Sequence, residues 1–425
     1  MPTIEEIEGL EILDSRGRPT VQATLTLTGA ARARAQVPSG ASTGGAEARE
    51  LRDGDPSRYN GLGCRRAAEN LSGEIRATAA TRSFPDQAAF DRFLIDLDGT
   101  PDKRRLGANA ILAASIAFAR AHAVERNLPF YRHLADVAAL PRPSTLPRPT
   151  INLFSGGKHA GGQVAIQDVL VVPIRATSTD EALAVVAAVY AAAADLSLRR
   201  YGSRALVADE GGLAPAFPSP EAMLDDATTA ISLAGFAPGE DVALAVDVAA
   251  SHFYEHGRYR IDDTLTPTAM IGRIGAWLDS YPIVSIEDGL AEEDWASWPL
   301  LRQRIGQRAL VLGDDLLTTN PDRIRRAVAA EAATALLLKV NQIGTLTEAA
   351  TALGLARSAG WSVTVSARSG ETEDDWLADL AVGWGGDQIK VGSIARSERL
   401  AKYNRLLEIE AETGLPLAGW PRTGR

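Results

Sequence analysis

Five short apolar runs in the second half of the chain each end at a charged residue, and this arrangement constrains the fold more than any other feature of the sequence. The runs are VALAV, YPIVSI, ALVLG, ALLL and WSVTVSA, and the charged residues after them are Asp247, Glu287, Asp314, Lys339 and Arg368. Successive endpoints lie 25 to 40 residues apart, close to the length of one strand, one helix and two connections. In a (β/α)8 barrel, functional side chains stand at the carboxyl ends of the strands. The pattern therefore predicts an α/β fold with a barrel and a site at that end.

The chain is too long to be a barrel alone. It has 425 residues, whereas a typical barrel needs about 250. Residues 3–37 alternate as in a strand meander, and residues 56–133 have helical periodicity. The segment LPRPSTLPRP, residues 140–149, carries four prolines and reads as a linker. We therefore predict an α+β N-terminal capping domain over residues 1–139 and a barrel catalytic domain over residues 140–425.

Composition excludes several classes of protein. The net charge of −10 disfavours nonspecific binding to nucleic acid or to an anionic membrane. The single cysteine, Cys64, cannot form an intramolecular disulfide, which fits a reducing compartment. We see no signal peptide and expect no run of membrane-span length. A cytoplasmic protein that binds neither nucleic acid nor membrane is the expectation.

Three of the endpoints are carboxylates on consecutive predicted barrel strands. Asp247, Glu287 and Asp314 offer the hard oxygen ligands that suit Mg²⁺. Any one of them alone is more often a helix cap or an ion-pair partner. Lys339 ends the next strand, and a lysine in an apolar run is costly to bury unless it is paired. Near cations its pKa should fall towards that of a general base, although it could simply pair with one of the acids.

Ordered motifs extend over essentially the whole chain. They are LDSRGRPTV, VPSGASTG, ELRDGD, LGANAIL, DEGG, SIEDGLAEEDW, GDDL, LLLKVNQIGTLTEA, SGETED, QIKVGS and RSERLAKYN. In this order they closely resemble the enolase family. The resemblance implies an enolase-type barrel preceded by an α+β cap domain, with a first barrel connection of two strands and two helices. It also implies a homodimer and a small anionic, phosphorylated or phosphonylated substrate.

The resemblance assigns roles to individual residues. Asp247, Glu287 and Asp314 would hold a first Mg²⁺, and Ser42 would help to bind a second, so that two ions serve each site. Lys339 matches the base that removes the proton alpha to a carboxylate. Two cations on that carboxylate would stabilise the resulting ene-diolate. Glu210 matches the acid that assists loss of the beta hydroxyl, and Asp168 belongs to the same acid cluster.

The remaining matched positions form an anion pocket. Arg368 offers a planar donor fork for phosphate oxygens. By the same resemblance, His159, Gln167, Ser369 and Lys390 handle phosphate and carboxylate groups of the substrate.

Two departures from the family pattern concern substrate choice. Ala367 in SARSGE stands where the family has histidine, and Asp168 in IQDVL stands where it has glutamate. One hypothesis is a housekeeping enolase that interconverts 2-phosphoglycerate and phosphoenolpyruvate in glycolysis. The other is a specialised paralogue, such as the carboxyphosphonoenolpyruvate synthases of phosphonate antibiotic biosynthesis. Such an enzyme takes a larger substrate, and a bulkier substrate group could occupy the volume that the missing imidazole leaves in a well-packed interior. A third is a non-catalytic protein that kept only the fold.

Overall fold

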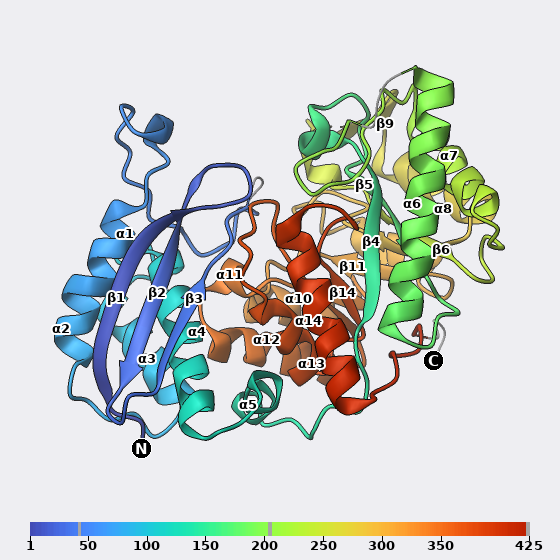
Figure 1. The fold of residues 1–425 in the computed structure, drawn as a ribbon. Coiled ribbons are helices and arrows are strands. Elements are labelled where there is room, and N and C mark those ends of the chain that lie inside the picture. The colour runs from blue at the N-terminus through green and yellow to red at the C-terminus, as the bar shows by residue number, and fades with distance from the viewer. Residues whose placement is uncertain (41–43, 203–205, 422–425) are drawn as a thin grey trace.

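The computed structural model describes residues 1–40, 44–202 and 206–421. Figure 1 shows two parts side by side, a smaller one built from the first third of the chain and a barrel built from the rest. The predicted order, an α+β cap followed by an eight-stranded barrel, is confirmed. The cap ends with α5 (Phe130–Val137), and the barrel begins with β4 (Arg148–Ser155). The boundary predicted between residues 139 and 140 falls in the segment between them and stays a prediction.

The cap is the predicted meander covered by helices. Its antiparallel sheet has the order β1-β2-β3, formed by Ile4–Leu13, Pro19–Leu27 and Arg32–Gln36. The helix α4 (Ala108–Glu125) packs on β2 and β3, and its many alanines let it lie close to the sheet. The other cap helices and turns are η1 (Tyr59–Gly61), α1 (Arg65–Asn70), η2 (Leu71–Ile75), α2 (Arg76–Ala79) and α3 (Gln87–Asp98).

The barrel closes in the order β10-β11-β12-β13-β14-β4-β5-β6. After β4 its strands are β5 (Asp168–Val172), β6 (Ala243–Asp247), β10 (Ile283–Glu287), β11 (Leu310–Gly313), β12 (Ala335–Leu338), β13 (Ser362–Ser366) and β14 (Gln388–Lys390). All five apolar runs are therefore strands. β5 alone is antiparallel to both neighbours. Because it runs in reverse, its first residue lies at the end of the barrel where the parallel strands finish.

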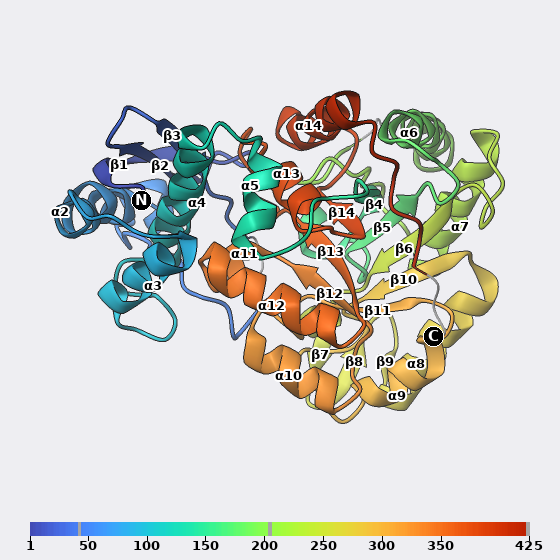
Figure 2. The same cartoon turned by 90° about the horizontal axis from the view of Figure 1, so that it is seen from below.

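Helices surround the barrel, as Figure 2 shows from below. They are α6 (Thr179–Tyr201), α7 (Pro220–Leu233), α8 (Pro267–Ser280), α9 (Trp298–Ile305), α10 (Pro321–Ala329), α11 (Val340–Ile343), α12 (Leu346–Ser358), α13 (Trp376–Gly383) and α14 (Ser397–Thr413). Between β6 and α8 lie η4 (Ala250–Phe253) and a small sheet of β7 (Tyr254–Glu255), β8 (Arg258–Arg260) and β9 (Thr264–Leu265). Two helices, α6 and α7, separate β5 from β6, so the connection of two strands and two helices implied by the resemblance is present.

One expectation about the sequence needs correction. Among the described residues, α6 is long and apolar enough to cross a membrane by length and composition, with a mean hydropathy of 1.6 over its best window. Its apolar character comes mainly from alanines, and in this structure it packs against α7, β4 and α14 in the outer layer of the barrel. A helix of a globular fold meets the same criterion.

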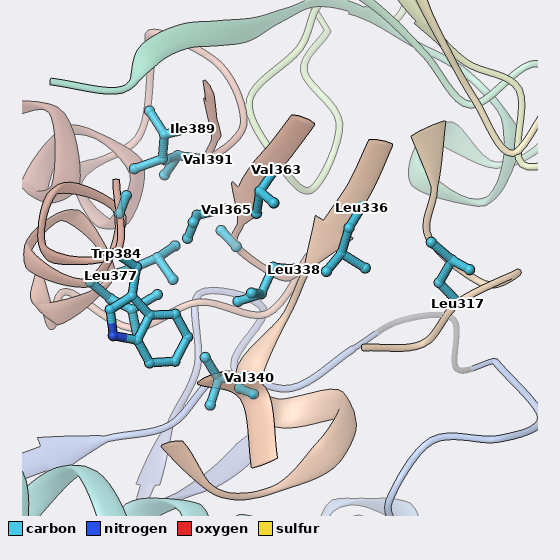
Figure 3. Close-up of a cluster of buried hydrophobic side chains, with 14 of the residues drawn as sticks. Leu317, Leu336, Leu338, Val340, Val363, Val365, Leu377, Trp384, Ile389 and Val391 are labelled. Atoms are coloured by element: carbon cyan, nitrogen blue, oxygen red, sulfur yellow. The ribbon is translucent and has the colours of Figure 1, made fainter. Parts of the chain in front are cut away.

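Alternate residues of the barrel strands build two apolar layers. Leu336, Leu338, Val363, Val365 and Ile389 point outward to the main core, where they meet side chains such as Trp384 (Figure 3). Inward-facing residues such as Leu312 and Leu337 form a separate cluster, on which Trp420 of the C-terminal segment packs. This period of two decides which strand residues can reach a site inside the barrel.

Loops of the cap contact the carboxyl ends of the barrel strands. Ser39 and Gly370 exchange two backbone hydrogen bonds of 2.8 and 2.9 Å. The Ser15 amide donates to the carbonyl of Glu371 at 2.7 Å. The cap thereby completes one wall of the barrel mouth.

Candidate functional site

Strand periodicity points most of the predicted site residues inward. On β12, Ala335 and Leu337 face the barrel interior, so Lys339 at the strand end shares their face. The same alternation places Asp247 with Ala245, and Asp314 with Leu310 and Leu312. It also places Asp168 with Leu170 and Val172 on the reversed strand β5. Side chains distant in the sequence thus meet at one end of the barrel.

Lys390 at the end of β14 joins two of the predicted metal ligands. Its Nζ donates to Asp247 Oδ2 at 2.8 Å and to Glu287 Oε2 at 2.7 Å, and all three residues are buried. Burial raises the pKa of Asp247, but the Lys390 charge outweighs it and holds that pKa at about 2. Burial, together with the neighbouring carboxylate of Asp247, raises the pKa of Glu287 well above its ordinary value. Gln167 also donates to Asp247 Oδ2, at 3.1 Å.

Lys339 is paired with the third predicted ligand. Its Nζ donates a short hydrogen bond to Asp314 Oδ2. Burial lowers the pKa of Lys339, but the Asp314 carboxylate outweighs it and raises that pKa above its ordinary value. The ion pair that the sequence left open as an alternative is therefore present. The lowered pKa was expected only beside bound cations and stays a prediction. Gln342 Nε2 holds the other Asp314 oxygen at 2.8 Å.

His159 and two acids form a second buried group. His159 Nδ1 lies 2.9 Å from Asp168 Oδ2, and its Nε2 lies 3.8 Å from Glu210 Oε1. Burial lowers the pKa of His159, but the two carboxylates outweigh it and raise that pKa to about 9. Burial raises the pKa of Asp168, whereas positive neighbours led by His159 outweigh burial at Glu210 and lower its pKa. The proton of this group is thus held by the histidine rather than by Glu210, the predicted acid.

The predicted phosphate fork already holds a carboxylate of the cap. Arg368 Nη1 and Nη2 donate to the two oxygens of Glu47 at 2.9 and 3.3 Å, and both side chains are buried. Arg16, another cap residue, donates to Ser369 Oγ at 3.2 Å. Ser42 lies outside the described residues. The cap therefore contributes to the anion pocket through two residues that the sequence analysis did not single out.

The carboxylates suit a divalent cation by type and by burial. Glu287 Oε1 is buried and has no hydrogen-bond partner among the described residues, so one acceptor of the predicted set is open. Two groups of described residues bring their ligand atoms within 4.8 Å of one another: His159, Asp168 and Glu210, and Asp288, Asp314 and Asp315. The predicted set of Asp247, Glu287 and Asp314 is not one of these. Lys390 donates to Asp247 and Glu287, and Lys339 donates to Asp314.

Several supporting residues were missed from the sequence. Asn152 Nδ2 donates to Glu210 Oε2 at 3.0 Å, and Ser155 Oγ donates to Asp168 Oδ1 at 2.5 Å. Asp288, with a positive φ of 40°, accepts from the amides of Asp314 and Asp315 at 3.0 and 2.7 Å. A polar residue inside an apolar strand, such as Asn152 in TINLF, was the signal available.

Ala367, the main departure from the family pattern, is buried and belongs to the large apolar cluster. The Ala367 methyl group therefore packs among apolar side chains of the main core. Gly211, with a φ of 88°, adopts the left-handed conformation that favours glycine at this turn.

Two family models match the chain. The model described as "Enolase, N-terminal domain" matches residues 4–134. The model described as "Enolase, C-terminal TIM barrel domain" matches residues 143–418. The two matches together span both parts of the fold in the expected order.

Proposed function

Because the chain belongs to the enolase family and is an enolase-like hydro-lyase, we propose that Lys339 removes the alpha proton of a 2-phosphoglycerate-type acid. The observation that carries this proposal is the placement of Lys339. It directly follows β12 and shares the face of the strand that points into the barrel, beside β11, which Asp314 follows. Water is then lost from the substrate to give an enol phosphate or phosphonate.

A lysine must be neutral to accept a proton. The Asp314 carboxylate raises the pKa of Lys339 and so holds it protonated in the ion pair. Lys339 therefore acts as a base when another cation balances Asp314. We propose that Asp247, Glu287 and Asp314 hold Mg²⁺, with Ser42 contributing to a second ion. When bound there, the metal would supply positive charge that favours loss of a proton beside the substrate carboxylate.

The proton for the leaving hydroxyl is held elsewhere. We assign it to the group of His159, Asp168 and Glu210, whose side chains lie within 3.8 Å of one another through the His159 ring, rather than to Glu210 alone. A base at Lys339 and an acid at this group provide separate residues for the two bond cleavages. Gln167 and Lys390 would help to orient the substrate carboxylate, and Arg368 and Ser369 would bind the phosphoryl end.

Within the family we propose a specialised paralogue, such as a carboxyphosphonoenolpyruvate synthase of phosphonate antibiotic biosynthesis, rather than a glycolytic enolase. The support is local and lies at two positions. Ala367 replaces a histidine beside the phosphate fork, and Asp168 replaces a glutamate in the acid group, whereas Lys339 and the metal-ligand carboxylates are kept. A homodimer and a cytoplasmic location stay predictions.

Turnover of 2-phosphoglycerate distinguishes the specialised paralogue from a glycolytic enolase. The assay follows absorbance of the enol product with Mg²⁺, for the wild type and for the variant Ala367→His/Asp168→Glu. Enzymes typically turn over about 10 times per second. We expect the turnover rate of the wild type to lie far below this value, and that of the variant to be higher than that of the wild type. A wild-type rate at or above that scale identifies a housekeeping enolase and contradicts the specialised assignment.

A further inference from the structure

A chain of five side chains connects the predicted phosphate site to the predicted base. Arg368 Nη1 and Nη2 donate to the two oxygens of Glu47 at 2.9 and 3.3 Å. Gln342 Nε2 lies 3.4 Å from Glu47 Oε1 and donates to Asp314 Oδ1 at 2.8 Å. Lys339 pairs with the other oxygen of Asp314. A cation therefore stands at each end of the chain with an acid beside it, and one uncharged amide joins the two acids.

The orientation of the Gln342 amide is fixed by Thr319. Thr319 Oγ1 accepts a hydrogen bond from the Lys339 amide at 2.9 Å, so its own hydrogen goes to Gln342 Oε1, 2.8 Å away. Gln342 Nε2 therefore faces the carboxylates, which can only accept. Thr319 is fully buried and has a φ of 51°, a conformation that β-branched residues rarely adopt. Backbone strain of this kind gathers at functional sites, which indicates that the placement of the amide serves function.

Glu47 occupies the atoms of Arg368 that a phosphoryl group would use. A phosphoryl group that binds the arginine end-on takes the same Nη1 and Nη2 atoms. Binding beside Glu47 would place two anions on one buried guanidinium, where like charges repel. The carboxylate must therefore leave the fork before the phosphoryl group takes it.

Other donors are in place to receive the Glu47 carboxylate. Its Oε1 accepts from the Gly44 amide at 2.9 Å and lies 3.4 Å from Gln342 Nε2. The Ala48 amide donates to the Gln342 carbonyl at 2.8 Å, so this segment of the cap is held beside Gln342. A buried carboxylate without donors is costly, and these two donors lower the cost of leaving Arg368.

We propose that Glu47 is a positioning residue that holds Arg368 until the phosphoryl group of the substrate displaces it, and that Gln342 receives the displaced carboxylate. This role rests on the proposed function, in which Arg368 binds the phosphoryl end. The Gln342 amide also holds Asp314, so arrival of the phosphoryl group changes the surroundings of Lys339 at the other end of the substrate.

The displacement also affects substrate choice. A phosphoryl group carries up to two negative charges and a carboxylate only one. Glu47 is therefore displaced more readily by a phosphoryl group, and it disfavours substrates that end in a carboxylate at this position.

Binding of inorganic phosphate to the full-length protein tests the exchange of partners. Dissociation constants are measured by phosphorus NMR at one fixed Mg²⁺ concentration. The proteins are the wild type, Glu47→Gln, Gln342→Met and the variant that combines both changes. Arg368→Gln identifies the site, because phosphate bound at the fork should be lost from it. Glu50→Gln is the matched control, since Glu50 belongs to the same cap segment but pairs with Arg52.

We expect Glu47→Gln to bind phosphate about tenfold more tightly than the wild type, because no carboxylate has to leave the fork. Glu50→Gln should change the affinity by less than about twofold, because screening weakens a distant charge. Glu47→Asp, whose shorter carboxylate reaches the fork less well, should change the affinity in the same direction if Glu47→Gln is too unstable to titrate.

The role of Gln342 is read from non-additivity. Gln342→Met should weaken phosphate binding about threefold in the wild type and leave that of Glu47→Gln unchanged, because no displaced carboxylate then needs a donor. An equal loss in both backgrounds overturns this role. Phosphate binding that is equal or weaker in Glu47→Gln, or a gain matched by Glu50→Gln, overturns the role of Glu47.

The reaction itself is read separately, from exchange of the alpha proton of 2-phosphoglycerate in D₂O. Exchange that requires Lys339, together with no gain in Glu47→Gln, rejects the displacement and keeps the reaction. A gain in Glu47→Gln with exchange that survives loss of Lys339 keeps the displacement and rejects the assigned base. Phosphate that binds Arg368→Gln as tightly as the wild type rejects the fork and the displacement together.

Discussion

Replacement of Gly370 by alanine should loosen the contact between the cap and the barrel mouth. A methyl group there would lie 2.2 Å from both Arg16 Nη2 and Asp14 Oδ2, which form a buried ion pair. Ordinary contact needs about 3.4 Å or more, so these atoms must move by about 1 Å. The φ of Gly370 is not in the left-handed region, and the cost is therefore steric.

The size of the effect follows from what has to move. Overpacking of a well-packed interior costs about 1–3 kcal/mol, and separating a buried pair costs about 3–5 kcal/mol. Because the pair can shift without separating completely, we expect Gly370→Ala to lower the free energy of unfolding by about 2–4 kcal/mol. With a urea slope of about 3 kcal/mol per molar, the midpoint falls by about 1 M.

Urea unfolding followed by tryptophan fluorescence provides the measurement, with Gly272→Ala and Gly354→Ala as controls. Both control glycines lie on exposed positions of helices, α8 and α12, with nothing within 4 Å of an added methyl group. They should therefore stabilise the protein by about 0.5–1 kcal/mol each, through helix propensity. A Gly370→Ala midpoint equal to that of the wild type or of the controls would refute the packing described for this contact.

Three further predictions concern titratable groups. Burial raises the pKa of Cys64 to about 12, so the folded protein should not react with a thiol reagent at pH 8, whereas the urea-unfolded protein should react fully. Burial lowers the pKa of His133 to about 4, so the unfolded chain takes up a proton at this residue before the folded protein does. The free energy of unfolding should therefore fall by about 3 kcal/mol as the pH falls from about 6.5 to 4. The urea midpoint of His133→Gln should fall less over this pH range than that of the wild type, and an equal fall contradicts the prediction. Asp168→Asn should lower the pKa of His159 from about 9 in an NMR titration, and an unchanged value would show that Asp168 does not set it.

Strand endpoints and their period of two were enough to predict most of the inner face of the site. Lys339 and Asp314 follow apolar strands directly, so their position at the barrel mouth needs no long-range information. Asp168 was different, because it begins a strand. Only the reversed direction of β5, which the hydrophobic pattern of the sequence does not reveal, brings it to the same end.

Contacts between distant segments could not be predicted from the sequence. Lys390 donates hydrogen bonds to both Asp247 and Glu287. These contacts depend on barrel closure, which brings β14, β6 and β10 around the same interior. The approach of Glu47 to Arg368 joins a cap loop to a barrel loop 321 residues away. No local pattern around Glu47 distinguishes it from a surface glutamate.

Exchange of the alpha proton of 2-phosphoglycerate in D₂O, followed by proton NMR with Mg²⁺ present, tests the central claim most directly. The wild type should exchange this proton even where net turnover is slow, because the base is intact. Lys339→Ala should exchange it at least about 100-fold more slowly while its Mg²⁺ affinity, measured by calorimetry, stays close to that of the wild type. Exchange at the wild-type rate in Lys339→Ala would show that another group removes the proton.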